Sequence, residues 1–255
     1  MGVGQLFKNI DSGKEGRNVG ISTSLPAIDS LIYGIQRKYL YTIGADTSGG
    51  KTSFAIDVFV YNLIKNAGTR PVSILYYSFE MSSDILFAKL LSLHIYDTYG
   101  EVITYDEILS LNEPISEEKY QYIQKSKEWL FELEKKVTIY DKALSPQGIY
   151  ATCKQWLKNF GQFIDVSEHK EDYIEDNPDH LKIALLDHVG LISGQGSKKE
   201  RIDLTVDFFI HFRNKCSLTG VFIQQLNRNS KGMDRKTNGY ELIQLDDYVK
   251  HKESN

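Results

Sequence analysis

The sequence predicts an α/β fold with a mostly parallel central sheet flanked by helices, and three observations favour it. Short apolar segments rich in β-branched and aromatic residues alternate with segments of helical periodicity. A glycine-rich segment lies between the first apolar segment and a helical one. The chain has 255 residues, of which 41% are hydrophobic and 25% charged, enough for one large domain with a sizeable core.

Five segments are expected to form strands, because each is short, apolar and bounded by turn-forming or polar residues. They are 39–44, 71–80, 137–140, 182–192 and 219–227, and the first is expected to be buried. Helical periodicity or capping residues predict helices between them. The predicted helices lie within 22–35 and at 51–65, 82–96, 145–161 and 199–216. Strands that alternate with helices predict parallel pairing through right-handed crossovers.

Polarity and charge divide the chain further. Residues 1–20 are polar and glycine-rich and are interpreted as an arm or linker, whereas 21–255 are interpreted as one domain. Within it, 98–118 and the acidic segment 165–180 are interpreted as surface insertions. Either insertion could bind a partner or simply be a solvated loop.

Composition excludes several function classes. The net charge of −4 provides no global field that attracts nucleic acid, so any such contact requires local basic clusters. The two cysteines are too few for a disulfide framework or a zinc site and indicate a reducing interior. No apolar run is long enough for a bilayer, and no signal-peptide core is present at the amino terminus, so we expect a cytoplasmic protein without a membrane partner.

The segment "ADTSGGKT" at 45–52 has the spacing of a phosphate-binding loop between a strand and a helix. Gly49 and Gly50 allow successive backbone N–H groups to face one anion. Lys51 can reach the β- and γ-phosphates, and Thr52 offers a hydroxyl to Mg²⁺. We therefore predict that ATP and Mg²⁺ bind here. The predicted nucleotide-binding residues are Ala45, Ser48, Gly49, Gly50, Lys51, Thr52 and Ser53.

Three further strand ends carry groups that nucleotide hydrolysis requires. Asp187 ends an apolar strand and is predicted, with Thr52, to hold the magnesium shell. Glu80 follows another strand and is predicted to orient the attacking water as the catalytic base. Gln224 and Gln225 end the last strand, where an amide could sense the γ-phosphate, but strand alternation allows only one of them to face it.

Two basic, glycine-containing segments follow these strand ends and are predicted to contact single-stranded DNA through its backbone. They contain no aromatic residues that would indicate base stacking, and two solvated loops are the alternative. The predicted DNA-binding residues are Lys198, Lys199 and Arg201 in the first segment and Arg228, Lys231, Arg235 and Lys236 in the second.

These motifs together resemble the RecA-like motor domain of DnaB-type replicative helicases, a P-loop NTPase fold. The resemblance extends from about Gly20 to Arg228, and its most specific parts are the alanine-type phosphate loop and the segments "SFEMS" and "QQLNR". It implies an ATP-dependent DNA helicase that forms a hexameric ring and moves on single-stranded DNA. Primase or a helicase loader would be further partners.

The resemblance also assigns roles to individual residues. It implies that Lys51 and Thr52 are the Walker A pair, Glu80 the catalytic base, Asp187 the Walker B acid and Gln225 the amide sensor. Lys51, Glu80 and Gln225 are thus the predicted catalytic residues.

The sequence departs from the family pattern in several places. The amino-terminal collar domain is not included, Arg37-Lys38 replaces the usual Pro-Gly, and the strands that carry the arginine finger are missing from the sequence. An arginine finger can contribute about 10³–10⁵ in rate, so slow hydrolysis is expected of this chain alone. Two alternatives remain open: a recombinase-like or clock-type ATPase that does not unwind DNA, and a nucleotide-binding regulator with weak hydrolysis.

Overall fold

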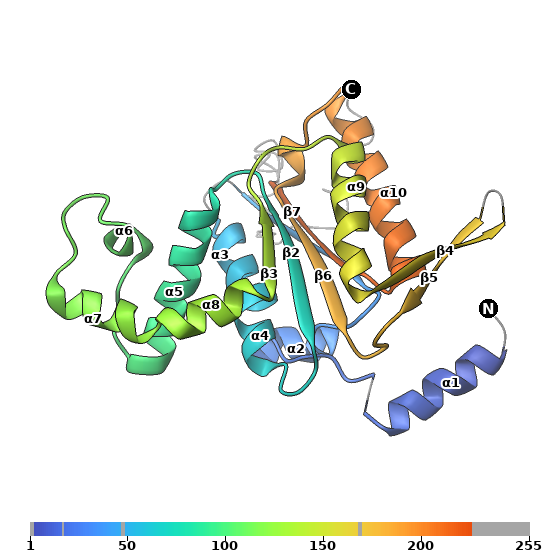
Figure 1. The fold of residues 1–255 in the computed structure, drawn as a ribbon, viewed down its shortest axis with the longest axis horizontal. Helices are drawn as coiled ribbons and strands as arrows, with labels where there is room; N and C mark the ends of the chain where they lie inside the picture. Colours follow the sequence, from blue (N-terminus) through green and yellow to red (C-terminus); the bar gives the residue numbers. More distant parts are fainter. Residues whose placement is uncertain (1–2, 17, 47–48, 168–169, 226–255) are drawn as a thin grey trace, which may run out of the picture.

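The computed structural model describes residues 3–16, 18–46, 49–167 and 170–225. A central parallel sheet has the strand order β1-β7-β6-β2-β3 and lies between two layers of helices (Figure 1). The strands of this sheet are β1 (Leu40–Ala45), β2 (Val72–Ser78), β3 (Val137–Tyr140), β6 (Leu181–Asp187) and β7 (Thr219–Gln225). The predicted α/β class with a mostly parallel sheet is confirmed.

Each face of the sheet packs against its own set of helices (Figure 1). One face is covered by α3 (Lys51–Ile56), the π-helical turn η1 (Asp57–Tyr61), α4 (Asn62–Asn66) and α5 (Ser83–Tyr99). The other face is covered by α9 (Pro146–Leu157) and α10 (Lys198–Cys216). Adjacent residues of β2 illustrate the alternation, because Tyr76 packs in the first core and Tyr77 in the second.

The chain has five further described helices. They are α1 (Val3–Lys14), α2 (Pro26–Ile32), α6 (Tyr105–Ile108), α7 (Glu117–Lys125) and α8 (Lys127–Glu134), with 3₁₀ turns at Lys158–Phe160 and Val189–Leu191. No helix in the described part of the chain combines the length and apolar character that a bilayer crossing needs.

One sequence expectation requires correction, and two further segments contain helices that the sequence analysis did not predict. The first strand, β1, is an edge strand and only half-buried, because it pairs with β7 alone among the described strands. The segment 98–118 includes α6, whose start is fixed by a capping box between Thr104 and Glu107, and its Ile103 is buried against α5. The arm at 1–20 contains helix α1, whose apolar side chains Leu6 and Phe7 are exposed.

The acidic segment 165–180, for which a solvated loop is one interpretation, includes much of a β-hairpin. Strands β4 (Gly161–Ser167) and β5 (Lys170–Glu175) pair antiparallel and lie beside α9 and α10 (Figure 1). Phe163 and Tyr173 face inward and pack with the second core. The segment therefore has the period-2 pattern of a strand pair, which its many acidic residues obscure in the sequence.

A buried ion pair attaches this hairpin to the sheet. Lys182 of β6 is fully buried, and its ammonium lies 2.8 Å from Glu175 of β5. Arg37 contacts the same carboxylate at 2.8 Å. Burial would raise the pKa of Glu175, but Lys182 and Arg37 hold the pKa below its usual range. Burial lowers the pKa of Lys182, and the contact with Glu175 opposes this decrease.

We expect Glu175→Ala to destabilise the fold by about 3–5 kcal/mol, because it leaves a buried ammonium without its partner. The variant should lower the pKa of Lys182 further. Its stability should then rise between about pH 7 and about pH 9.5, because the folded state releases this proton at a lower pH than the unfolded state does. Urea unfolding at both pH values measures this.

The control for this prediction is Glu132→Ala. Glu132 pairs with Lys135 where both side chains are about two-thirds exposed, so its removal should cost less than about 1 kcal/mol. Equal destabilisation by the two variants would contradict the importance of the buried pair.

Candidate nucleotide-binding site

The sheet topology brings the predicted site residues to one edge. The carboxyl ends of β1, β7, β6 and β2 lie side by side, because all these strands are parallel. Ala45, which begins the phosphate loop, is the register partner of Gln225. Asp187 is the register partner of Ser78, and Ser78 lies two residues before Glu80 in the sequence. Groups that are far apart in the sequence thus converge where ligands bind in open parallel sheets.

The phosphate loop has the backbone geometry that its glycines predict. Gly50 has a φ of 73°, in the left-handed region, and precedes helix α3. A Cβ atom added at Gly49 would lie 2.9 Å from the carbonyl oxygen of Asp46, so the turn is too tight for a side chain there. The Gly49 N–H donates to that oxygen at 3.0 Å. Ser48 is outside the described residues, and Ala45, Thr52 and Ser53 lie at the ends of the loop.

The Lys51 ammonium is held against the loop. Its Nζ atom donates to the carbonyl oxygen of Asp46 at 2.7 Å. The positive end of α3 and this ammonium therefore act on the same small region of space. A phosphate group is an anion that a helix amino terminus and this ammonium can both attract.

Asp187 is the most unusual residue of the site. Its side chain is 1% exposed, and burial raises its pKa, an effect that the Thr52 and Tyr76 side chains oppose. The Tyr76 hydroxyl donates to Oδ2 at 3.0 Å, whereas the buried Oδ1 atom has no hydrogen-bond partner among the described residues. A buried carboxylate oxygen without a partner, near a threonine hydroxyl, fits the oxygen ligands that Mg²⁺ prefers, directly or through water.

Glu80 and His188 lie close to this carboxylate. Glu80 is exposed just after β2, and its charge contributes to raising the pKa of Asp187. Burial lowers the pKa of His188, while the charges of Glu80 and Asp187 act in the opposite direction. The His188 Nδ1 atom accepts from the Gly190 N–H at 3.1 Å. Sequence reasoning missed His188, although its place directly after the strand-ending aspartate is a signal that could have identified it.

The two glutamines at the end of β7 differ in environment. Gln225 is exposed beside Ala45, and Gln224 is half-buried beside Gly44. Gln225 thus lies at the phosphate-loop end of the sheet, a position that suits the predicted sensor.

The first basic segment is more ordered than the sequence suggested. Lys198 and Lys199 lie in the first turn of α10, which Ser197 and Glu200 cap reciprocally, and not in a flexible loop. Both lysines are exposed. The charge of Lys198 lowers the pKa of His188 further. Lys198 therefore lies near the edge of the sheet at which β6 ends.

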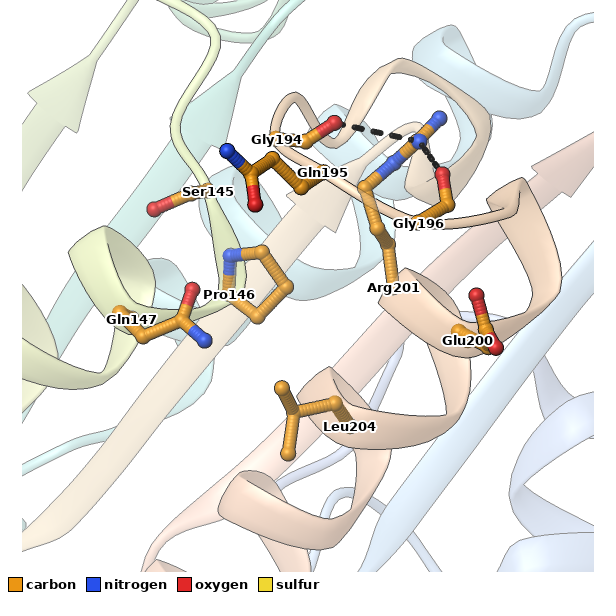
Figure 2. A pocket seen from close by; sticks show the side chains of 9 residues that line it. All are labelled: Ser145, Pro146, Gln147, Gly194, Gln195, Gly196, Glu200, Arg201 and Leu204. Atoms are coloured by element: carbon orange, nitrogen blue, oxygen red, sulfur yellow. Dashed lines mark hydrogen bonds between the residues drawn. The ribbon is translucent and has the colours of Figure 1, made fainter.

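Arg201 has a structural role that its charge did not predict. Its guanidinium donates to the carbonyl oxygen of Ile192 at 2.9 Å. It also donates to the carbonyl oxygens of Gly194 at 3.4 Å and Gly196 at 2.6 Å, so it holds the loop before α10 (Figure 2). Arg201 and Gly196 help to line a cavity of about 440 Å³ between the starts of α9 and α10. The second predicted DNA-binding set, Arg228, Lys231, Arg235 and Lys236, lies outside the described residues.

Comparison with known proteins identifies the family. Residues 20–238 match the model of the DnaB-like helicase C-terminal domain. The chain belongs to this family. The match covers most of the sequence and includes the phosphate loop and all five strands of the parallel sheet.

Individual relatives agree with this assignment. The replicative DNA helicase DnaB of Rickettsia typhi is 32% identical over 123 residues, which are 46% of this chain and 23% of that protein. The DnaB of Rickettsia prowazekii is 31% identical over 123 residues, with 46% and 24% covered. The aligned part thus spans about a quarter of each relative.

Solved structures show the same fold at low identity. One solved ATPase domain superposes with a TM-score of 0.65 at 18% identity, covering 90% of this chain and 71% of that one. A DnaB-like replicative helicase, solved in a study of its interactions with primase, gives a TM-score of 0.63 at 18% identity, with 90% and 48% covered. These neighbours support the RecA-like fold that the resemblance implied.

We expect Gly50→Ala to impair nucleotide binding through strain in the phosphate loop. A β-carbon in the left-handed region costs roughly 1–2 kcal/mol. Gly68→Ala is the matched control, since Gly68 also has a positive φ of 58° and, like Gly50, has no atom within 4 Å of an added Cβ. Both variants should lose similar stability in thermal unfolding, but only Gly50→Ala should weaken binding of a fluorescent ATP analogue. Equal binding by the two variants would contradict the assignment of the loop.

Proposed function

We propose that this chain is the ATP-hydrolysing motor domain of a replicative DNA helicase that translocates on single-stranded DNA. The observation that carries the proposal is the convergence of the phosphate loop, Asp187, Glu80 and Gln225 at one edge of a parallel sheet. Each supplies a different requirement of phosphoryl transfer to water, and family membership supports their combination.

The roles follow from the positions of the side chains. The amides around Gly50 and the ammonium of Lys51 bind the β- and γ-phosphates. Thr52 and Asp187 would hold Mg²⁺, which neutralises phosphate charge when bound. Glu80 accepts the proton of the attacking water, and its exposed carboxylate is accessible to that water. Gln225 contacts the γ-phosphate and couples its release to the polypeptide that follows β7.

The partners in this proposal come from the relatives. The replicative DNA helicase relatives support DNA as a partner, and a DnaB-like helicase studied with primase supports primase. A ring, single-stranded DNA and a loader are the further partners and assembly that the family resemblance implies. The exposed Lys198 and Lys199 supply local positive charge in a chain of net charge −4. Contact with a phosphate backbone is the interaction that such lysines support.

We expect Lys51→Ala to abolish ATP hydrolysis that is stimulated by single-stranded DNA, because a triphosphate then lacks its cation at the loop. A coupled phosphate-release assay with and without single-stranded DNA measures the change. Lys158→Ala, at an exposed position at the far end of α9, is the charge-matched control and should retain the wild-type rate. Unchanged turnover in Lys51→Ala would refute the proposal, and a strand-displacement assay separates a helicase from an ATPase that does not unwind DNA.

We expect the double variant Lys198→Ala/Lys199→Ala to weaken binding of single-stranded DNA while nucleotide binding stays at the wild-type level. The slope of log K against log salt should decrease by about 0.7 for each DNA phosphate that is no longer neutralised. Fluorescence anisotropy at several salt concentrations measures both quantities. An unchanged slope would show that these lysines do not face DNA. Arg201→Ala should differ by lowering stability, since Arg201 holds main-chain carbonyls.

A further inference from the structure

We propose that Tyr76 is a positioning residue that orients Asp187 for the metal ion, an inference that rests on the proposed nucleotide chemistry. Tyr76 is fully buried in β2. Its hydroxyl donates to Asp187 Oδ2 at 3.0 Å. The hydrogen bond leaves Oδ1 as the oxygen available to the metal or to its water ligands.

The register of two strands makes this contact possible. Asp187 of β6 lies opposite Ser78 of β2, so Tyr76, two residues earlier, is the diagonal neighbour on the same face. Diagonal Cβ atoms in a sheet are roughly 7–8 Å apart, a distance that long aromatic side chains can bridge. A phenylalanine would fill the same space but leave Oδ2 without its donor.

The unpaired Oδ1 atom of Asp187 indicates that the hydrogen bond from Tyr76 serves the site. Buried polar atoms are normally hydrogen-bonded, so a buried carboxylate with one satisfied oxygen and one that has no partner among the described residues needs an explanation. If the carboxylate served only to pack or to fix the sheet, both oxygens would be expected to have partners. Thr52, the second residue of α3, acts on the same carboxylate and opposes the rise of its pKa. The tyrosine therefore satisfies Oδ2, and Oδ1 is the oxygen that we assign to the metal ion or its water ligands.

The adjacent residue provides a matched control. Tyr77 is also fully buried in β2, but it points to the other face of the sheet. Its hydroxyl lies 3.1 Å from the carbonyl oxygen of Ile149 and 2.9 Å from the Thr152 hydroxyl of α9. Replacing either tyrosine by phenylalanine removes one buried hydroxyl from the same strand, yet only Tyr76 is hydrogen-bonded to Asp187.

The experiment compares Tyr76→Phe and Tyr77→Phe by binding of a fluorescent ATP analogue in EDTA and in increasing Mg²⁺. In EDTA both variants should bind as the wild type does. We expect the Mg²⁺-dependent gain in affinity to fall about 10-fold in Tyr76→Phe, as for other residues that orient a metal ligand, and to be unchanged in Tyr77→Phe. Electron paramagnetic resonance can measure the affinity of the protein–nucleotide complex for Mn²⁺. This affinity should fall in Tyr76→Phe and stay at the wild-type level in Tyr77→Phe.

Two further variants test whether the effect belongs to the hydroxyl and acts through Asp187. Tyr76→Leu also lacks the hydroxyl but packs differently, and it should show the same weakened Mg²⁺ dependence. In an Asp187→Asn background, Tyr76→Phe should add nothing, because the two changes act on one interaction. Thermal unfolding of each variant identifies the folded fraction for the binding experiments.

The outcomes separate this inference from the proposed function. Wild-type protein whose nucleotide affinity does not respond to Mg²⁺ would count against the proposed function itself. A normal response in the wild type with equal responses in Tyr76→Phe and Tyr77→Phe would overturn the role of Tyr76 alone. Additive effects of Tyr76→Phe and Asp187→Asn would overturn it as well.

Discussion

The burial of the Asp187 carboxylate is the constraint on which the rest of the site depends. A carboxylate removed from water is costly unless it is compensated, and here one oxygen is compensated by Tyr76 while the other has no partner within the described residues. The same burial raises the pKa of this group. Compensation of the buried carboxylate therefore depends on residues from three separate elements, which are β2, α3 and β6.

The two faces of the sheet carry different groups of residues. The face covered by α3 and α5 is the one to which we assign the nucleotide chemistry, because Tyr76 and the helix that follows the phosphate loop lie there. The face covered by α9 and α10 carries the hairpin and the basic first turn of α10. Alternation of side chains along β2 keeps the two groups separate even though Tyr76 and Tyr77 are neighbours in the sequence.

Much of this architecture follows from the sequence, for reasons that particular elements make clear. The strand at Val137–Tyr140 and the helix begun by Ser145 and Pro146 have local signals, and the structure has them where those signals are. The convergence of Asp187 with Glu80 was predictable because parallel strands end at one edge. The Tyr76 contact was not, because it depends on the register between β2 and β6, which no local pattern specifies.

Other elements eluded prediction for the same physical reason. The hairpin formed by β4 and β5 is stabilised by Tyr173, Lys182 and Arg37, which come from separate parts of the chain, and its acidic surface suggested a solvated loop. Arg201 has the positive charge of a DNA-binding residue, yet its guanidinium donates hydrogen bonds to backbone carbonyl oxygens. Charge alone does not reveal whether a side chain faces a ligand or the protein itself.

Strand β6 carries a buried ionisable side chain near each end, Lys182 at the start and Asp187 at the finish. Lys182 forms an ion pair with the hairpin, and Asp187 accepts a hydrogen bond from β2. The strand is therefore anchored near both ends by side chains of opposite charge. Adding or deleting a single residue between them would rotate one of the two onto the wrong side of the pleat and leave an ion in hydrocarbon. The number of residues from Ile183 to Leu186 is therefore constrained by these two contacts.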